Sequence, residues 1–158
     1  MLEIVGVIGI VASMILVAAE LRKANEIAST QAEMALAEQR NILHQQRATN
    51  PDMAKLFPKL ESPEAHLTTA TDASQIRGIA WHNVNLLRSV QNAYRDELIS
   101  RKVRDAYVAD FDWTIEQWPG IRSHYVEIYR DTESLQNLAE FAALAELAAA
   151  ERPPDSAD

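Results

Sequence analysis

The sequence predicts an all-α protein, in which an N-terminal transmembrane helix continues into a helical stalk that leads to a small bundle of about four to five helices. From Ile4 to Ala19, 16 consecutive residues carry no charge. The whole chain of 158 residues has four glycines, which leaves little material for tight hairpin turns. Beyond residue 50, apolar residues recur every three or four positions, as in helices that bury one face.

The first element is a transmembrane helix over residues 2–21. Twenty helical residues extend about 30 Å, which matches the hydrocarbon thickness of a bilayer. Glu3 and Glu20 then lie at the two ends of the span. A secretory signal peptide and a buried core helix are the alternatives. A signal peptide needs a positively charged start, whereas Glu3 is the only charged side chain before the apolar run.

Basic residues predict the orientation of this helix. Arg22 and Lys23 follow the apolar run directly, and no Lys or Arg precedes it. By the positive-inside tendency the C-terminal domain is cytoplasmic and the N-terminus lies outside. We therefore expect a single-pass protein of the inner (plasma) membrane, in contact with membrane lipid.

Gly9 and Ser13 form a small-xxx-small pair within the predicted span. This spacing allows two membrane helices to approach closely and to associate. The alternative is that glycine and serine are simply common in membrane helices.

Composition disfavours several classes of function. The chain has no cysteine, which removes disulfides, thiolate zinc sites and thiol nucleophiles. Its net charge of −8 disfavours nucleic acid as a partner, because phosphate binding needs a basic surface. The sequence contains no nucleophile elbow, phosphate-binding loop or dinucleotide fingerprint. We therefore expect no cofactor and no enzymatic activity.

The histidines do not stand at the spacings of metal ligands, so we expect no metal site. A structural or solvent-exposed role is the simpler interpretation for each of them: His44, His66, His82 and His124. His124 and Glu127 are three residues apart, so they can form a local hydrogen bond on one helix.

The stalk, residues 22–48, has neither proline nor glycine and consists mostly of good helix formers. We expect it to continue the membrane helix as one rod, packed against its own domain or against a neighbouring copy. The cytoplasmic domain, residues 50–150, follows, and residues 151–158 are a proline-rich acidic tail that we expect to be disordered.

The domain begins with Asn50-Pro51-Asp52, which is typical of a helix start. This short helix should end before Pro58, and residues 61–71 should form a connecting loop.

The central helix is predicted over residues 72–100, with Asp72 or Thr71 as its cap. Its apolar positions recur every three or four residues: Ile76, Ala80, Val84, Leu87, Val90, Tyr94 and Leu98. The next helix spans residues 101–117 and ends at the Pro119-Gly120 break. Its inward face comprises Val103, Tyr107, Phe111, Ile115 and Trp118.

Two further helices complete the predicted domain. The first should turn Ile121, Tyr125 and either Ile128 or Tyr129 inward. The last begins at Asp131 or Thr132, and its inward face comprises Leu135, Leu138, Phe141, Ala142 and Ala145.

Three segments carry a resemblance to a known group. They are Asn50-Pro51-Asp52 with MAKLF, then WHNVNLLRSVQNAYRDELISRKV, then FDWTIEQWPGIRSHYVEIY. Over residues 20–130 the chain resembles a widespread group of uncharacterised bacterial single-pass membrane proteins with a small helical cytoplasmic domain. It departs from that group at Ser123-His124-Tyr125, where the group often has tryptophan. The resemblance implies the fold and the topology, and it implies no activity and no site residues.

The start of the helix at residue 101 carries a basic cluster of Arg101, Lys102 and Arg104. Positive charge there opposes the helix dipole, so it needs another cause. We expect either ion pairs with the preceding Asp96 and Glu97 or contact with an anion.

The same helix carries carboxylates on one side and aromatic side chains on the other. Asp105, Asp112 and Glu116 share a face that can meet a cation or a basic partner, or can simply be solvated. The aromatic residues of the second half should form the bundle core. Trp113 lies off that face and is a candidate partner contact.

These observations lead to one functional hypothesis and one alternative. The first is a membrane-anchored helical protein-interaction or scaffold module with no catalytic site, which binds another membrane or cytoplasmic protein or itself. The alternative is an oligomeric membrane effector or sensor whose cytoplasmic domain binds a small anionic ligand.

Overall fold

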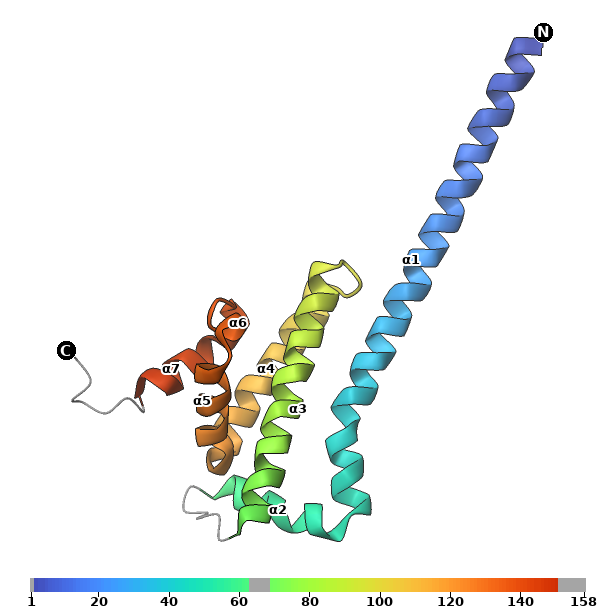
Figure 1. The fold of residues 1–158 in the computed structure, drawn as a ribbon. Coiled ribbons are helices and arrows are strands. Elements are labelled where there is room, and N and C mark those ends of the chain that lie inside the picture. The colour runs from blue at the N-terminus through green and yellow to red at the C-terminus, as the bar shows by residue number, and fades with distance from the viewer. Residues whose placement is uncertain (1, 63–68, 151–158) are drawn as a thin grey trace, which may run out of the picture.

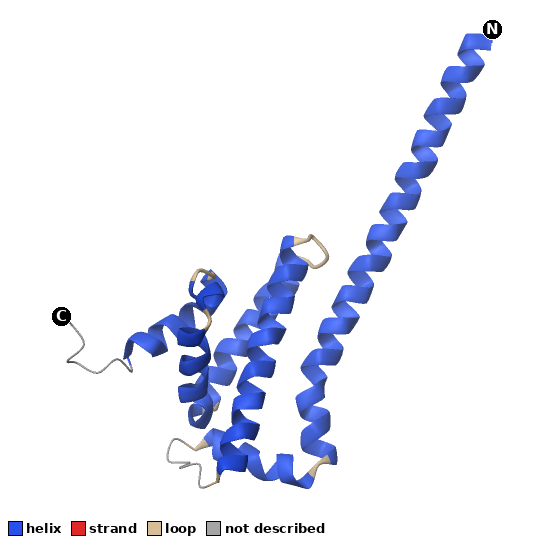
Figure 2. Cartoon of the chain, viewed as in Figure 1, coloured by secondary structure: helices blue, strands red, loops and turns tan. Residues whose placement is uncertain are grey.

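A computed structural model describes residues 2–62 and 69–150, with side chains described from Gly9 onward except that of Glu140. Every regular element within these ranges is a helix, so the predicted all-α class is confirmed (Figures 1 and 2). One long helix projects away from a bundle formed by the rest of the chain (Figure 1). The proline-rich tail, residues 151–158, lies outside the described residues.

The long helix, α1 (Leu2–Thr49), runs without interruption through 48 residues. The predicted continuity between the N-terminal segment and the stalk is therefore confirmed. The bundle-side part of α1 packs on its own domain through Leu36 and Leu43, which are both buried. Among the described residues, we find no helix with both the length and the apolar character that crossing a bilayer requires.

The second helix, α2 (Pro51–Glu61), starts where the sequence predicts. The side-chain oxygen of Asn50 accepts hydrogen bonds from the backbone N–H of Asp52, at 3.0 Å, and of Met53, at 3.4 Å. These bonds satisfy two of the free donors of the first helical turn, and a proline at the first position needs no such partner.

The prediction that this helix ends before Pro58 was wrong, because α2 continues for three residues beyond the proline. A proline inside a helix costs one backbone hydrogen bond and some strain. Leu56, Phe57 and Leu60 are all buried in the core, and only a continuous helix places the three on one face. Their burial therefore offsets the cost of the proline.

The central helix, α3 (Ala70–Arg95), begins earlier and ends earlier than predicted. Thr69 caps it, with its hydroxyl oxygen accepting from the backbone N–H of Asp72 at 3.0 Å, so the predicted caps were wrong. It ends at Arg95 and not at residue 100, because Glu97 takes a left-handed backbone conformation with φ of 59°. The loop before it was predicted over residues 61–71, of which 63–68 lie outside the described residues.

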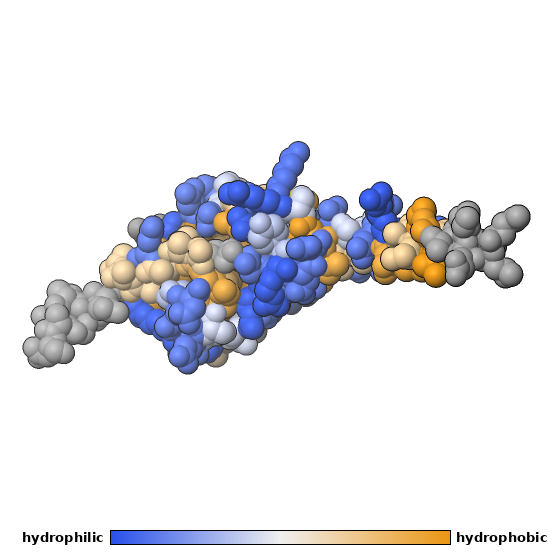
Figure 3. All heavy atoms as spheres, turned by 90° about the horizontal axis from the view of Figure 1, so that it is seen from above, coloured by the Kyte–Doolittle hydropathy of each residue, from blue (hydrophilic) through white to orange (hydrophobic). Residues whose placement is uncertain are grey.

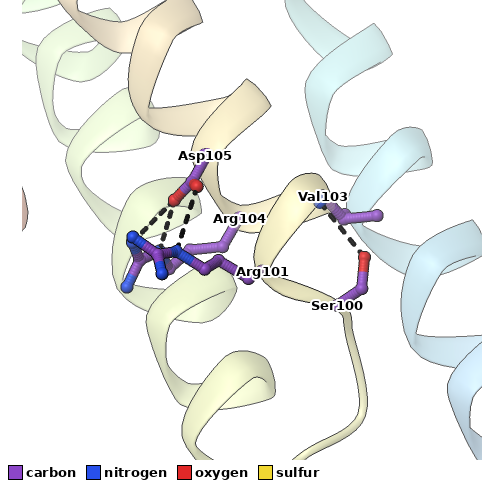
Figure 4. Close-up of polar contacts among 5 residues, drawn as sticks. All are labelled: Ser100, Arg101, Val103, Arg104 and Asp105. Atoms are coloured by element: carbon purple, nitrogen blue, oxygen red, sulfur yellow. Dashed lines mark hydrogen bonds and ion pairs between the residues drawn. The ribbon is translucent and has the colours of Figure 1, made fainter.

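A Schellman motif closes α3. The backbone N–H of Leu98 donates to the carbonyl of Ala93 at 2.8 Å, and that of Glu97 donates to the carbonyl of Tyr94 at 3.1 Å. The short turn that follows leads directly into α4 (Arg101–Gln117), whose bounds match the prediction. The hydroxyl oxygen of Ser100 caps α4 by accepting from the N–H of Val103 at 3.3 Å (Figure 4).

The chain turns back after α4 at the predicted Pro119-Gly120 break. A 3₁₀ turn, η1 (Pro119–Ile121), leads into α5 (Arg122–Asp131). The turn packs against the end of α2, where a Cβ on Gly120 would lie 2.3 Å from the carbonyl oxygen of Lys59. Only glycine fits this approach without a shift of the backbone.

The prediction of one last helix was wrong, because the chain forms α6 (Glu133–Gln136), η2 (Ala139–Phe141) and α7 (Ala142–Ala150). The bundle therefore has more and shorter helices than the four to five predicted. Leu135, Phe141 and Leu144 are each fully buried, and a single straight helix cannot bury all three on one face. Ala142, predicted to face inward, is exposed.

The core joins α2, α3, α4, α5 and the C-terminal helices. Phe111 connects α4 to this core, with its ring edge-on to Tyr125 at a centroid distance of 5.4 Å and to Phe141 at 5.9 Å. A second cluster of Leu36, Val90 and Ile99 attaches α1 to the far end of the α3–α4 pair. The bundle-side half of α1 is thus part of the domain.

Candidate functional site

A groove lies between α1 and α4, with α3 as its floor. Both α1 and α4 pack on α3, whereas they approach each other at few positions. The space between them has a volume of about 440 Å³. Its lining comes from α1, α2, α3, α4 and the turn after α4: Arg40, Leu43, His44, Phe57, Asn83, Leu86, Leu87, Tyr107, Asp110, Phe111, Trp113, Thr114 and Trp118.

The deepest part of the groove is apolar and aromatic. Phe57, Leu87 and Phe111 belong to the buried core, so their positions are fixed by the packing of the bundle. The ring of Phe57 meets that of Trp118 edge-on at 5.5 Å. The groove therefore has a rigid apolar base, and the less buried Leu86, Trp113 and Trp118 supply the surface that an apolar side chain or ligand can contact.

Trp113 lies at the rim of this groove and is 56% exposed. It is off the buried face of α4, as its helical position predicts. An indole that remains this exposed in an otherwise well-packed bundle is unusual for a structural residue, and tryptophan is enriched where proteins bind one another. Its role as a partner contact, expected from the sequence, remains a proposal.

An ion pair between Arg40 on α1 and Asp110 on α4 crosses the mouth of the groove. The same guanidinium lies 5.7 Å from the ring centroid of Tyr107. Partial burial raises the pKa of the Tyr107 hydroxyl above its usual value. This phenol is therefore neutral at physiological pH and can donate a hydrogen bond into the groove.

Basic side chains recur along the edge of α1 that borders the groove. Arg40 and His44 line it, and the guanidinium of Arg47 lies 4.4 Å from the ring centroid of Phe57. Arg40, Arg47 and Asp110 were not predicted from the sequence as site residues. The spacing of Arg40, His44 and Arg47 by four and three residues was the available signal, since it places them on one side of a helix.

Asn83 is the polar group on the floor. Its side-chain amide donates to the hydroxyl of Tyr125 at 2.7 Å. Tyr125 is fully buried, and this burial raises the pKa of its phenol far above the usual value. The hydrogen bond fixes the orientation of the Asn83 amide at the base of the groove.

The predicted basic cluster does not line the groove. The guanidinium of Arg104 contacts Asp105 at 2.6 Å, and that of Arg101 contacts the same carboxylate at 3.5 Å (Figure 4). Arg104 also lies 4.6 Å from the ring centroid of Tyr94. Asp105 thus provides a counter-charge for both arginines, whereas Lys102 is exposed. Contact of this cluster with an anion stays a prediction.

The predicted acidic face is divided in the structure. Asp105 contacts the arginines, while Asp112 lies near Glu116 and near Glu146 of α7. Burial raises the pKa of Asp112, and the neighbouring charges of Glu116 and Glu146 raise it further. Within the described ranges, no three histidine, aspartate or glutamate side chains are grouped so as to hold a metal ion.

Two of the histidines make contacts that connect or support helices. One ring nitrogen of His82 lies 3.0 Å from the backbone carbonyl of Gln39 and so links α3 to α1. His124 is mostly buried, and its Nδ1 lies 3.5 Å from the carboxylate of Glu127. The predicted local pair is therefore close, although this separation is long for a hydrogen bond. His66 lies outside the described residues.

Gly9 and Ser13 lie on the projecting part of α1. The hydroxyl of Ser13 donates to the carbonyl of Gly9 at 2.9 Å, and a Cβ on Gly9 would meet no atom within 4 Å. An open depression extends along this side of the helix, lined by Gly9, Ile10, Ser13, Met14, Val17, Ala18 and Leu21. The surface is accessible to a second helix, and its use for association stays a prediction.

Comparisons with protein-family models, with curated proteins and with solved structures found no match to the chain. The resemblance noted in the sequence therefore stays a prediction. The function of the groove is inferred from its own residues and geometry.

Proposed function

We propose that the chain is a membrane-anchored protein-interaction module whose groove binds the apolar face of a helical segment of another protein. The apolar groove with the exposed Trp113 at its rim carries this proposal. An exposed tryptophan beside a rigid apolar base offers a large contact area at little entropic cost to a partner. No residue arrangement in the groove suggests a chemical reaction.

The membrane anchor in this proposal rests on residues 2–21. Large apolar side chains on the projecting part of α1 are exposed, including Met14 at 67% and Ile15 at 66% (Figure 3). Exposed apolar residues gathered on one segment mark a surface that is covered by lipid or by protein. Together with Arg22 and Lys23, they support a span of the inner membrane with the N-terminus outside.

The length of the stalk sets the place of the groove in this arrangement. The helix between Leu21 and Arg40 extends for about 30 Å. The groove is then held well beyond the lipid headgroups, on the cytoplasmic side. Such a position favours a partner in the cytoplasm, or the cytoplasmic part of another membrane protein, over the bilayer itself.

A reporter that is active only in the cytoplasm, fused after Asp158, tests the anchor and its orientation. We expect the fusion to be active and to sediment with membranes. Replacing Ile10 and Met14 with lysine should move it to the soluble fraction, because charge in the centre of a span is costly. An inactive, well-expressed fusion contradicts the orientation, and a soluble wild-type fusion contradicts the anchor.

Site-specific photo-crosslinking in native membranes tests the binding groove. A photoreactive amino acid at His44, which lines the groove, should give a discrete crosslinked product with another protein. The same probe at Lys102 provides the control. Lys102 lies in the first turn of α4, outside the groove, so it should not give this product. Loss of the His44 product on Trp113→Ala supports the proposal. A product that forms equally from both positions, or from neither, contradicts it.

Self-association through α1 is a second candidate, favoured by the open depression beside Gly9 and Ser13. Small residues at this spacing allow close packing of two membrane helices. Gly9→Leu should therefore reduce the oligomer size in mild detergent. Val11→Leu, on an exposed position outside the depression, is the matched control. An unchanged size in Gly9→Leu excludes this face as the contact.

A further inference from the structure

We infer that the segment bound in the groove is an amphipathic helix with an acidic flank. Its apolar face packs on Leu86, Trp113 and Trp118, which line the groove and retain exposed surface, and its acidic flank faces the basic edge of α1. This inference rests on the proposed function, and it specifies the chemistry of the partner.

The shape of the groove favours a helix as the occupant. Three helices, α1, α3 and α4, surround it, and the two outer ones pack on α3 and hardly on each other. In a four-helix bundle, the space between two such helices is filled by a fourth. A helix placed there inserts side chains at positions i, i+3 or i+4, and i+7 into an apolar groove. The volume of about 440 Å³ suits a few such side chains.

The α1 edge of the groove determines the charge of the occupant. Arg40, His44 and Arg47 occupy one side of α1 over two helical turns. The side chain of Arg47 is positioned by its contact with the Phe57 ring, at the end of the groove. The chain has a net charge of −8, so a basic row beside the groove is a local departure from its overall charge. Carboxylates spaced by three and four residues on an incoming helix match this row.

The opposite edge adds a second requirement. Asp110 on α4 contacts Arg40, and both side chains are about half exposed. A carboxylate of the incoming helix can take the place of Asp110 at Arg40 at little cost, because a pair this exposed contributes little stability. Asp110 then faces the other flank of the bound helix, where a second carboxylate would be repelled. The partner helix is therefore acidic on the α1 side and neutral or basic on the α4 side.

Selection from a displayed library of helical 15-residue peptides tests this inference. The target is the full chain in mild detergent, and binders that also recognise Trp113→Ala are removed. We expect the enriched peptides to carry large apolar residues at helical spacing with Asp or Glu on one flank. Enrichment of peptides without an acidic flank overturns the inference, while the proposed function stands. Failure to enrich any Trp113-dependent peptide overturns both.

Fluorescence anisotropy of the best peptide then tests the charge match directly. Exchange of its acidic residues for lysine should weaken binding at least tenfold. Arg40→Glu combined with Arg47→Glu should reverse this preference, whereas Lys102→Glu, outside the groove, should leave it unchanged. Circular dichroism establishes that each variant is folded. Equal binding of the acidic peptide and its lysine-exchanged form overturns the inference. A Trp113-dependent dimer of the unbound chain also overturns it, because a second copy would then be the occupant.

Discussion

Arg40 on α1 and Asp110 on α4 form the ion pair that bridges the two edges of the groove. Exposed pairs of this kind contribute about 0.2–1 kcal/mol to stability. We therefore expect a double-mutant cycle of Arg40→Ala and Asp110→Ala to give a coupling energy below about 1 kcal/mol. Urea unfolding of the full chain in mild detergent, followed by tryptophan fluorescence, measures it. A coupling above about 2 kcal/mol would show that the pair fastens α1 to the bundle.

Two glycines in the domain should respond to the same substitution in opposite directions. Gly120→Ala places a Cβ 2.3 Å from the carbonyl oxygen of Lys59, so α2 and the turn must move apart. We expect a loss of about 1–3 kcal/mol in the free energy of unfolding. Gly78→Ala, in the interior of α3, meets no atom within 4 Å and should gain about 0.5–1 kcal/mol.

The comparison of these two variants tests the packing of η1 on α2. Urea unfolding under identical conditions provides both values. If Gly120→Ala were neutral, the close approach between the turn and the end of α2 would not exist in solution.

Some features that depend on local hydrogen bonds were predictable from the sequence, although the Thr69 cap and the turn at Glu97 were not, and features that depend on distant contacts were missed. The Asn50 cap and the bounds of α4 follow from residues within one helical turn. α2 continues past Pro58 because Leu60 is buried against other helices. The apolar periodicity of the sequence does not reveal such contacts. The groove was invisible for the same reason, because Arg40 and Asp110 are 70 positions apart in the chain. Of the groove residues, Trp113 alone was predicted as a partner contact, since its helical position leaves it outside the core.

The Schellman motif after α3 has a glutamate where glycine is the usual residue. Glu97 adopts φ of 59°, a conformation that costs an ordinary side chain about 1 kcal/mol. Glu97→Gly should therefore raise the free energy of unfolding by roughly 0.5–1 kcal/mol. Glu97→Ala is the control, since alanine keeps the penalty of the left-handed conformation. If both variants gained equally, removal of the charge would be the cause and not the backbone.

Lys59 and Asp72 connect α2 to α3 through a contact of 2.6 Å. Hydrogen bonds from Lys59 and then from Thr69 lower the pKa of the Asp72 carboxyl. An aspartate whose pKa is lower in the folded state stabilises the protein above the unfolded pKa of about 3.9. This stability is lost as the pH falls through the folded pKa.

Asp72→Asn should therefore unfold at a lower urea concentration than the wild type at pH 7, and the difference should shrink toward pH 3. Asp52→Asn, at an exposed position in the first turn of α2, is the matched control for loss of a carboxylate. A difference for Asp72→Asn that stays constant over this range would mean that the carboxylate is not ionised in its contact with Lys59.

Tyr125 should make the protein sensitive to alkaline pH. Its phenol is completely buried against Asn83, and this burial raises its pKa far above 10 in the folded state. In the unfolded chain the same phenol ionises near pH 10. Above that pH the unfolded state therefore holds fewer protons than the folded state, so stability falls as the pH rises. One such group contributes a slope of about 1.4 kcal/mol per pH unit.

The variant Tyr125→Phe isolates this contribution. At pH 7 it should be less stable than the wild type by about 0.5–1.5 kcal/mol, because it loses the hydrogen bond from Asn83. Between pH 10 and 11.5 its free energy of unfolding should fall less steeply than that of the wild type. The difference in stability between the two proteins therefore becomes smaller as the pH rises. Tyr129→Phe, on the same helix and only partly buried, is the control and should retain the wild-type slope. Equal slopes for Tyr125→Phe and the wild type would mean that water reaches this phenol from the groove and that the floor beside Asn83 is open.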